Sequence, residues 1–328
     1  MNFEGAKGWL IGEPNKGLSC MFTMMNSARL MVGMQGLGVA ESAYQIALGF
    51  ARERLQSRSI SGPKAADKPA DPIMVHPDVR RMLLRQKVMI EGCRALAYFA
   101  GLQQDIAHGA EDAEVRTRAD DLVQLLTPVV KAFLTDEGFT CANEGLQVLG
   151  GSGFTEDWGI EQLVRDSRIT RIYEGTNGIQ ALDLVGRKLA LGGGRAVRAY
   201  FALVEGWLKS NTDAPHAAAV TQALKQLQQA TLWLASEGSK DPEQAAAAAT
   251  PYLRLFGLAS LAWLWSQQAQ LAQRHLDAGT SETHFYAAKV KSADFFMARI
   301  LPETDALLSE IKAGKATLMA FTDEEFAA

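Results

Sequence analysis

Apolar residues recur at helical spacing along most of the 328-residue chain. Between residues 18 and 192 the intervals of three, four or seven positions leave one apolar face on each segment. Three such faces consist of Leu37, Tyr44, Leu48, Ala51 and Leu55; of Val79, Met82, Gln86, Met89, Cys93, Leu96 and Ala100; and of Val115, Leu122, Leu126, Val129 and Phe133. A shorter segment, residues 159–172, leads into a fourth helix at about 176–191, where Asn177 and Gln180 resemble a capping box. This pattern predicts a four-helix bundle.

The helical pattern breaks at three consecutive glycines, residues 192–194. Three glycines end a helix and loosen the joint, so we predict a domain boundary there. Residues 195–328 are helical again and rich in Ala and Leu. One apolar stripe in this part consists of Leu255, Leu258, Ala262, Trp265, Ala269 and Ala272. We therefore predict an extra C-terminal helical domain over 195–328, behind a bundle over 18–192.

Residues 1–17 differ from everything that follows, because short apolar pieces lie between glycines and end in a turn at 13–17. The pattern predicts one or two short strands, a small β remnant in front of an otherwise all-α chain. Two strands alone are marginally stable in water. They must therefore either pack on the helices or belong to a sheet that is missing from this sequence.

The charge balance excludes several classes of partner. The 33 basic residues are scattered among 37 acidic ones, and the net charge is −4. This distribution lacks the concentrated basic face that nucleic-acid binding needs. No apolar run approaches the ~20 residues of a membrane span, and the start lacks a secretory signal pattern. We expect a cytoplasmic protein that binds neither nucleic acid nor membrane, with Cys20, Cys93 and Cys141 as reduced thiols.

Several common catalytic motifs are excluded as well. The glycine-rich run GGSG does not fit GxSxG, because Phe154 stands where the last glycine belongs. No GxxxxGK[ST] phosphate loop occurs. Gly33, Gly36 and Gly38 fall inside a helical pattern and follow no strand, which argues against a Rossmann fingerprint. The five histidines show no HExxH and no ligand spacing, so no metal site is predicted.

The segment RIYEGTN, residues 171–177, is the remaining candidate for chemistry. An acidic residue just before a helix has a plain structural explanation, because a carboxylate at a helix N-terminus is stabilised by about 0.3–1 kcal/mol. Gly175, directly after Glu174, would let a ligand approach the backbone closely. From the residue pattern alone, both interpretations of Glu174 stay open.

Residues 142–180 resemble the signature of the acyl-CoA dehydrogenase family almost residue for residue, through GGxGF, an acidic turn, RD and IYEGTxxIQ. The resemblance extends back through ARERLQ at 51–56 and SARL at 27–30 to GEPNKGL at 12–18. That last motif ends the middle β-domain of the family. The loop SGPKAADKPADP and the helical part from about residue 195 resemble a longer subgroup, which includes 3-methylmercaptopropionyl-CoA dehydrogenases.

The resemblance implies a reaction and a base. Glu174 would take the α-proton of an acyl-CoA thioester while the β-hydride passes to FAD, giving a trans-2-enoyl-CoA. The carboxylate must be desolvated for this, and the backbone N–H of Glu174 would help to polarise the thioester carbonyl. Some family members carry the base at the position that matches Ala28, where alanine cannot do this work. Electrons would pass to an electron-transfer flavoprotein, and an oxidase variant stays open.

The resemblance also implies substrate contacts. Arg29 matches a residue that approaches the bound acyl-CoA, although it could instead bridge a nearby carboxylate. Gly175, beside the base, is the second residue that we expect at the substrate.

The implied FAD contacts are spread along the chain. Arg54 matches an arginine that reaches the flavin pyrophosphate across a subunit interface, although it could simply belong to a solvated helix end. Gln147, Gly150 and Gly151 match contacts to the FAD of a neighbouring subunit, so we expect a homodimer or higher assembly. Thr176 matches a hydroxyl near the flavin phosphates and could equally be a local helix cap.

The sequence departs from the family pattern in ways that leave a second hypothesis open. Ser57 stands where an aromatic residue is frequent, and Pro77 and Gly178 stand where glutamines are common. The N-terminal helical domain of the family and most of its β-domain have no counterpart here. The second hypothesis is a non-catalytic helical assembly or binding module, which should expose a large apolar patch.

Overall fold

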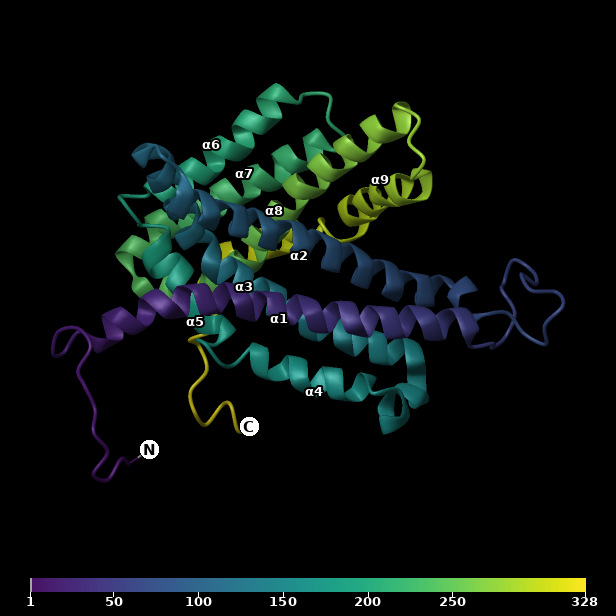
Figure 1. Cartoon of the computed structure of the whole chain (residues 1–328), viewed down its shortest axis with the longest axis horizontal. Coiled ribbons are helices and arrows are strands. Elements are labelled where there is room, and N and C mark those ends of the chain that lie inside the picture. The colour runs from purple at the N-terminus through teal and green to yellow at the C-terminus, as the bar shows by residue number, and fades with distance from the viewer. Residues whose placement is uncertain (1) are drawn as a thin grey trace.

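The computed structural model describes residues 2–328, except for the side chains of residues 19, 22 and 23; Met1 lies outside the described part. Within it the chain is helical and forms no sheet, which confirms the predicted all-α class. Three long helices run side by side, and the shorter α4 lies along them (Figure 1). The bounds of the elements in this bundle are α1 Gly17–Glu53, α2 Pro77–Gly109, α3 Ala113–Leu149, α4 Ile160–Thr170 and α5 Asn177–Asp183.

Glycines bring α1 and α3 unusually close together. A Cβ atom on Gly36 would lie 2.8 Å from the carbonyl oxygen of Leu134, and one on Gly138 would lie 2.6 Å from that of Gly36. Gly33 meets Val130 in the same way. A larger residue at these positions would force the helices apart, because protein interiors are already close-packed. The glycines of α1 therefore serve helix packing, in agreement with their exclusion from a Rossmann motif.

The predicted fourth helix is shorter and less regular than the sequence pattern indicated. After α5 the chain continues into a π-helical turn, Leu184–Lys188, and then into the three glycines. The predicted capping box is wrong. Thr176 caps α5 by accepting the N–H of Ile179, because the amide of Asn177 is bound to α3 instead.

The C-terminal part packs around one central helix, α8, which contacts α2, α3, α5, α7, α9 and α10. All six residues of the predicted stripe from Leu255 to Ala272 are buried on it. A Cβ atom on Gly257 would meet the ring of Phe133 at 2.4 Å, so α8 lies directly against α3. Both parts therefore share one continuous core, and the domain boundary stays a prediction. The bounds here are α6 Arg195–Ser210, α7 Ala217–Trp233, α8 Pro242–Asp277, α9 Thr283–Arg299 and α10 Glu303–Ala313.

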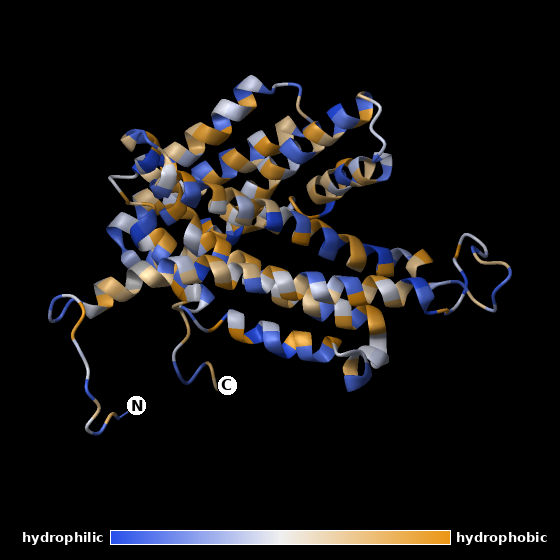
Figure 2. Cartoon of the chain, viewed as in Figure 1, coloured by the Kyte–Doolittle hydropathy of each residue, from blue (hydrophilic) through white to orange (hydrophobic). Residues whose placement is uncertain are grey.

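The strands predicted in the N-terminal segment are wrong. Residues 2–16 form no strand, and they lead away from the helices (Figure 1). Trp9 is 84% exposed and Ile11 is 94% exposed. No described segment lies alongside to supply hydrogen-bond partners, and an unpaired extended segment does not form a strand by itself. In contrast, each helix in Figure 2 carries both hydrophobic and hydrophilic residues, as a helix with one buried face should.

The polar loop between α1 and α2 projects from one end of the bundle (Figure 1). It is closed at its base by a bridge between Leu55 and Pro72. The buried carboxylate of Asp71 organises it by accepting the backbone N–H groups of Ser59, Lys64 and Ala65. These hydrogen bonds hold the pKa of Asp71 well below its usual range. No helix of the described residues is long and apolar enough to cross a membrane.

Candidate active site

Glu174 lies on the turn between α4 and α5, where the backbone takes a conformation that ordinary residues avoid. Its φ is 56° and that of Gly175 is 83°, so two consecutive residues are left-handed. A non-glycine residue in this region is uncommon and marks a site that its surroundings hold in place. A Cβ atom on Gly175 would lie 2.4 Å from Nε2 of Gln180, so a larger residue there would have to displace the Gln180 side chain.

Three side chains from three helices hold the carbonyl groups of this turn. Arg29 of α1 donates from Nε to the carbonyl oxygen of Glu174 at 3.3 Å. Gln180 of α5 donates from Nε2 to the same oxygen at 3.2 Å. Lys131 of α3 donates from Nζ to the carbonyl oxygen of Gly175 at 2.8 Å. The hydrogen bonds to these two carbonyl oxygens attach the turn to α1, α3 and α5.

Asn177 connects the end of the turn to α3. Its Nδ2 donates to the Ala132 carbonyl at 3.2 Å and to Oδ1 of Asp136 at 2.9 Å. Its Oδ1 accepts from Nζ of Lys131 at 2.9 Å. The same Asp136 carboxylate also pairs with Arg171 at the start of the turn. The whole segment from 171 to 177 is thus anchored on one stretch of α3.

The carboxylate of Glu174 itself is left without a partner. Its Oε2 is buried and accepts no hydrogen bond from any described residue. The backbone N–H of Glu174 likewise takes part in no hydrogen bond within the described part of the chain. Buried polar atoms are nearly always paired, and an exception calls for an explanation. A carboxylate and an N–H that lie on one residue and are both unused can together bind a carbonyl compound and accept a proton.

Arg29, which we predicted as a substrate contact, lies inside the bundle, and its role at the substrate stays a prediction. It is only 6% exposed, and its guanidinium lies between the Glu174 carbonyl and the carboxylate of Asp183, at 4.0 Å from the latter. The alternative interpretation, an arginine beside a nearby carboxylate, therefore describes its surroundings. Thr176 likewise acts as a helix cap, which was the alternative to a flavin contact.

Lys131 was not predicted from the sequence. It is fully buried, and burial lowers its pKa to about 8, against the opposing influence of Asp136. The available signal was a single lysine inside the otherwise apolar run from Val129 to Leu134, since buried lysines are rare without a partner. Its partners come from a segment more than 40 positions further along the chain, which no local pattern reveals.

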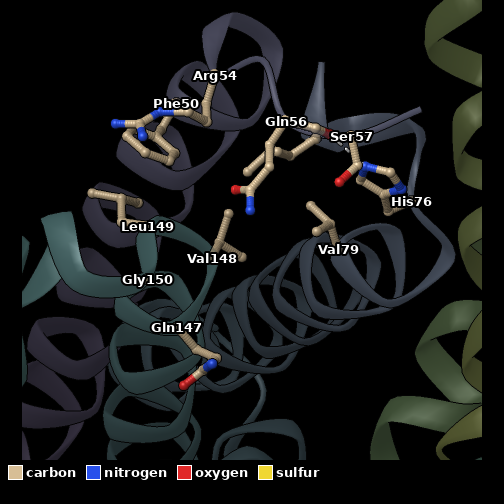
Figure 3. A pocket seen from close by; sticks show the side chains of 11 residues that line it. Phe50, Arg54, Gln56, Ser57, His76, Val79, Gln147, Val148, Leu149 and Gly150 are labelled. Carbon is tan, nitrogen blue, oxygen red and sulfur yellow. Dashed lines mark hydrogen bonds between the residues drawn. The ribbon is translucent and has the colours of Figure 1, made fainter. Parts of the chain in front are cut away.

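A second group of predicted residues meets at the other end of the bundle. Arg54, Gln147 and Gly150 line one open pocket of about 450 Å³ (Figure 3). The guanidinium of Arg54 lies over the ring of Phe50 at 4.7 Å and donates to Oγ of Ser152 at 3.3 Å. No ion pair among the described residues involves Arg54, so its charge is available to an anion. Gly151 follows directly in the same glycine turn.

The two groups of residues do not come together in one chain. Arg29 and Arg54 are 25 positions apart on α1 and its C-terminal cap, which corresponds to about 37 Å at the helical rise. Glu174, Gly175 and Thr176 are at the first end, and the Arg54 pocket is at the second. No group of three or more His, Cys, Asp or Glu residues in the described ranges is arranged to hold a metal ion.

Comparison with known proteins gives two family matches, which together cover most of the chain. The family "Acyl-CoA dehydrogenase, C-terminal domain" matches residues 15–189, and "Acetyl-CoA dehydrogenase C-terminal like" matches residues 200–322. The 3-methylmercaptopropionyl-CoA dehydrogenase of Ruegeria pomeroyi is 42% identical over 95% of this chain and 53% of its own length. The broad-specificity linear acyl-CoA dehydrogenase FadE5 of Mycobacterium tuberculosis is 34% identical over 90% of this chain and 51% of its own length.

Solved structures agree on the fold. Caenorhabditis elegans ACDH-11, in complex with C11-CoA, is similar with a TM-score of 0.72 at 19% identity, over 94% of this chain and 49% of that one. An acyl-CoA dehydrogenase from Bacillus anthracis, complexed with FAD, is similar with a TM-score of 0.68 at 22% identity, over 96% of this chain and 53% of that one. The chain spans about half the length of the relatives that it matches.

Proposed function

The chain belongs to the acyl-CoA dehydrogenase family, and on that premise we propose that Glu174 is the base in the α,β-dehydrogenation of an acyl-CoA thioester. In this proposal the chain is the C-terminal part of such an enzyme. Glu174 takes the α-proton, and the product is a trans-2-enoyl-CoA.

The observation that carries the proposal is the unpaired carboxylate of Glu174. A thioester α-proton is only weakly acidic, so its removal requires a carboxylate that is not already neutralised by a neighbouring cation. The unused N–H of the same residue would donate to the thioester oxygen as negative charge develops there, as in an oxyanion hole. The left-handed turn carries both groups, while Arg29 and Lys131 bind its carbonyls and make no hydrogen bond to the carboxylate.

FAD fits the second pocket, on the observation that Arg54 carries a charge without an acidic partner beside an open glycine turn. Arg54 would bind the pyrophosphate, and Gln147, Gly150 and Gly151 would approach the dinucleotide closely. A bound FAD would supply the acceptor for the hydride that leaves the β-carbon. Because about 37 Å along α1 separates this pocket from Glu174, we propose that each FAD uses Arg54 of one copy and Glu174 of another. A homodimer or larger assembly follows from this.

The remaining partners stay proposals too. We propose that electrons pass on to an electron-transfer flavoprotein and that the protein works in the cytoplasm. Cys20, Cys93 and Cys141 are all free thiols, which suits a reducing compartment.

Exchange of the substrate's α-hydrogens tests the base directly, because this step needs no hydride acceptor. The chain is incubated with butyryl-CoA in D2O, and deuterium uptake is followed by mass spectrometry. Glu174→Gln should slow the uptake by about 10²–10⁴-fold, the usual contribution of a general base. Glu144→Gln, at a partly buried glutamate that pairs with Arg85, is the matched control and should leave the rate unchanged. Equal rates in wild type and Glu174→Gln would refute the proposal.

Titration with FAD separates this function from the second candidate. Exposed apolar side chains at the start of the chain and on α1, including Trp9, Ile11, Leu18 and Met31, favour a helical assembly module. A chain that binds FAD turns yellow, and butyryl-CoA should bleach it without oxygen in wild type but not in Glu174→Gln. A chain that neither binds FAD nor catalyses exchange would support the assembly module.

A further inference from the structure

We propose that Lys131 is a positioning residue for Glu174: its hydrogen bonds hold the turn that carries this glutamate. This inference rests on the proposed function of Glu174. It deepens that function by assigning a role to a buried cation that the reaction itself does not use.

The hydrogen bonds of Lys131 are all directed at the turn and its anchor. Nζ lies 2.8 Å from the Gly175 carbonyl oxygen and 2.9 Å from Oδ1 of Asn177. The first of these acceptors adjoins the base, and the second caps no helix but ties the turn to α3. One ammonium thereby joins the residue after Glu174 to the anchoring amide.

Core stability does not account for a lysine at this position. The side chain is fully buried, and burying an ammonium is costly even when it is hydrogen-bonded. Its pKa of about 8 leaves it mostly protonated at neutral pH. Between that value and the ordinary pKa of about 10.4, the unfolded chain binds more protons than the folded one. Stability therefore rises with pH across this window, so the charge opposes folding and requires another explanation.

The backbone of the turn supplies that explanation. Glu174 and Gly175 are both left-handed, a conformation that the chain leaves unless several contacts restrain it. A charge-assisted hydrogen bond is roughly twice as strong as a neutral one. With its carbonyls bound by Lys131 and Arg29, the turn leaves Oε2 and the N–H of Glu174 without a hydrogen-bond partner among the described residues. Loss of the ammonium should let the turn relax and move the Glu174 carboxylate away from the position at which it would reach the α-proton of the substrate.

The test compares Lys131→Met with Lys131→Arg and with Lys188→Met, a half-buried lysine outside the turn. Amide hydrogen exchange should accelerate in the segment 173–177 of Lys131→Met and stay unchanged elsewhere. Deuterium uptake by butyryl-CoA should slow by about 10–100-fold, as expected for a displaced base, while butyryl-CoA affinity changes little. Lys131→Arg should restore much of the amide protection in 173–177 and much of the rate of deuterium uptake. Lys188→Met should match wild type in both measurements.

A second measurement applies even if Lys131→Met fails to fold. The charged groups that face Lys131 are Arg29 on α1, Asp136 on α3 and Glu174 on the turn. Raising the pH from 7 to 9 discharges Lys131, so amide exchange in 173–177 should rise more in wild type than in Lys131→Arg at the same pH.

The outcomes separate the two proposals. Unchanged amide exchange in 173–177, in both the Met variant and the pH series, overturns the role of Lys131 whatever the activity. Faster amide exchange with normal α-hydrogen exchange also overturns it, because the turn would then not position the base. A Glu174→Gln variant with undiminished α-hydrogen exchange would instead refute the function of Glu174, and the amide result would stand separately.

Discussion

Two glutamates of this molecule, one buried and one half-buried, have opposite surroundings. Glu137, on α3, lies between two arginines: Arg254 donates from Nη1 at 2.8 Å and Arg85 from Nη2 at 3.2 Å. Burial alone would raise the pKa of Glu137, but the two cations outweigh it and hold the pKa below its ordinary value. Glu174 has a buried oxygen with no partner at all. A carboxylate that is fully paired holds helices together, whereas one left unpaired is available to a substrate.

The difference also shows in where the nearby cations act. Around Glu137 the arginines bind the carboxylate itself, and Arg254 reaches on to Glu303, so that α2, α3, α8 and α10 are joined. Around Glu174 the cations bind the backbone carbonyls and leave the carboxylate alone. Similar charges thus join helices in one region and hold the turn that carries Glu174 in the other.

The largest effect on stability should come from breaking the paired site. Glu137→Gln removes the charge that Arg85 and Arg254 share, which leaves Arg85 with Glu144 and Arg254 with Glu303. We expect the free energy of unfolding to fall by about 3–5 kcal/mol, the usual effect of breaking a buried pair. Urea denaturation measures this, and Glu144→Gln should cost much less, because burial already raises the pKa of Glu144 despite Arg85 and Arg81.

The pH dependence of this effect has a definite sign. The folded pKa of Glu137 is depressed, so its contribution is fully present above the ordinary pKa of about 4.3 and is lost as the pH falls through the folded value. The gap in stability between wild type and Glu137→Gln should therefore shrink in acid. A gap that stayed constant from pH 7 to pH 3 would show that charge is not what the pair contributes.

A middle-sized effect is expected at the turn. Gly175→Ala places a Cβ atom against Gln180 in a left-handed backbone, which should lower the free energy of unfolding by about 1–3 kcal/mol. Because the base is next to it, α-hydrogen exchange should fall as well. Gly178→Ala, where a Cβ atom meets nothing, is the matched control for both measurements.

The smallest effect on stability should come from the unpaired glutamate. Glu174→Gln removes the charge of a half-buried carboxylate whose Oε2 accepts no hydrogen bond from a described residue, so the unfolding free energy should change by less than about 1 kcal/mol. The same substitution should nearly abolish α-hydrogen exchange. A loss of stability as large as that of Glu137→Gln would mean that Glu174 is a structural residue, and the contrast between the two sites would disappear.

The sequence was informative where the pattern is local. The stripe from Leu255 to Ala272 is buried as predicted, and the helical bundle follows from the spacing of apolar residues. The strands predicted in residues 1–17 are absent from residues 2–16, because a strand needs a neighbour and no described segment lies alongside. Lys131 was missed and Asn177 was assigned to the wrong contact, since both depend on helices far apart in the sequence. The role of Glu174 rests on the motif, and that of the Arg54 pocket stays a prediction.

The shared core has a consequence for how this architecture can change over generations. The glycine triplet at 192–194 looks like a natural place for genes to recombine, since a cut there would separate two helical halves. Yet Gly257 of α8 lies flat against Phe133 of α3, and the Arg254–Glu137 pair crosses the same boundary. Either half of this chain alone would expose apolar surface and lose the Arg254–Glu137 pair. A recombination that separated the two halves of this chain should therefore require compensating substitutions on the faces that it exposes.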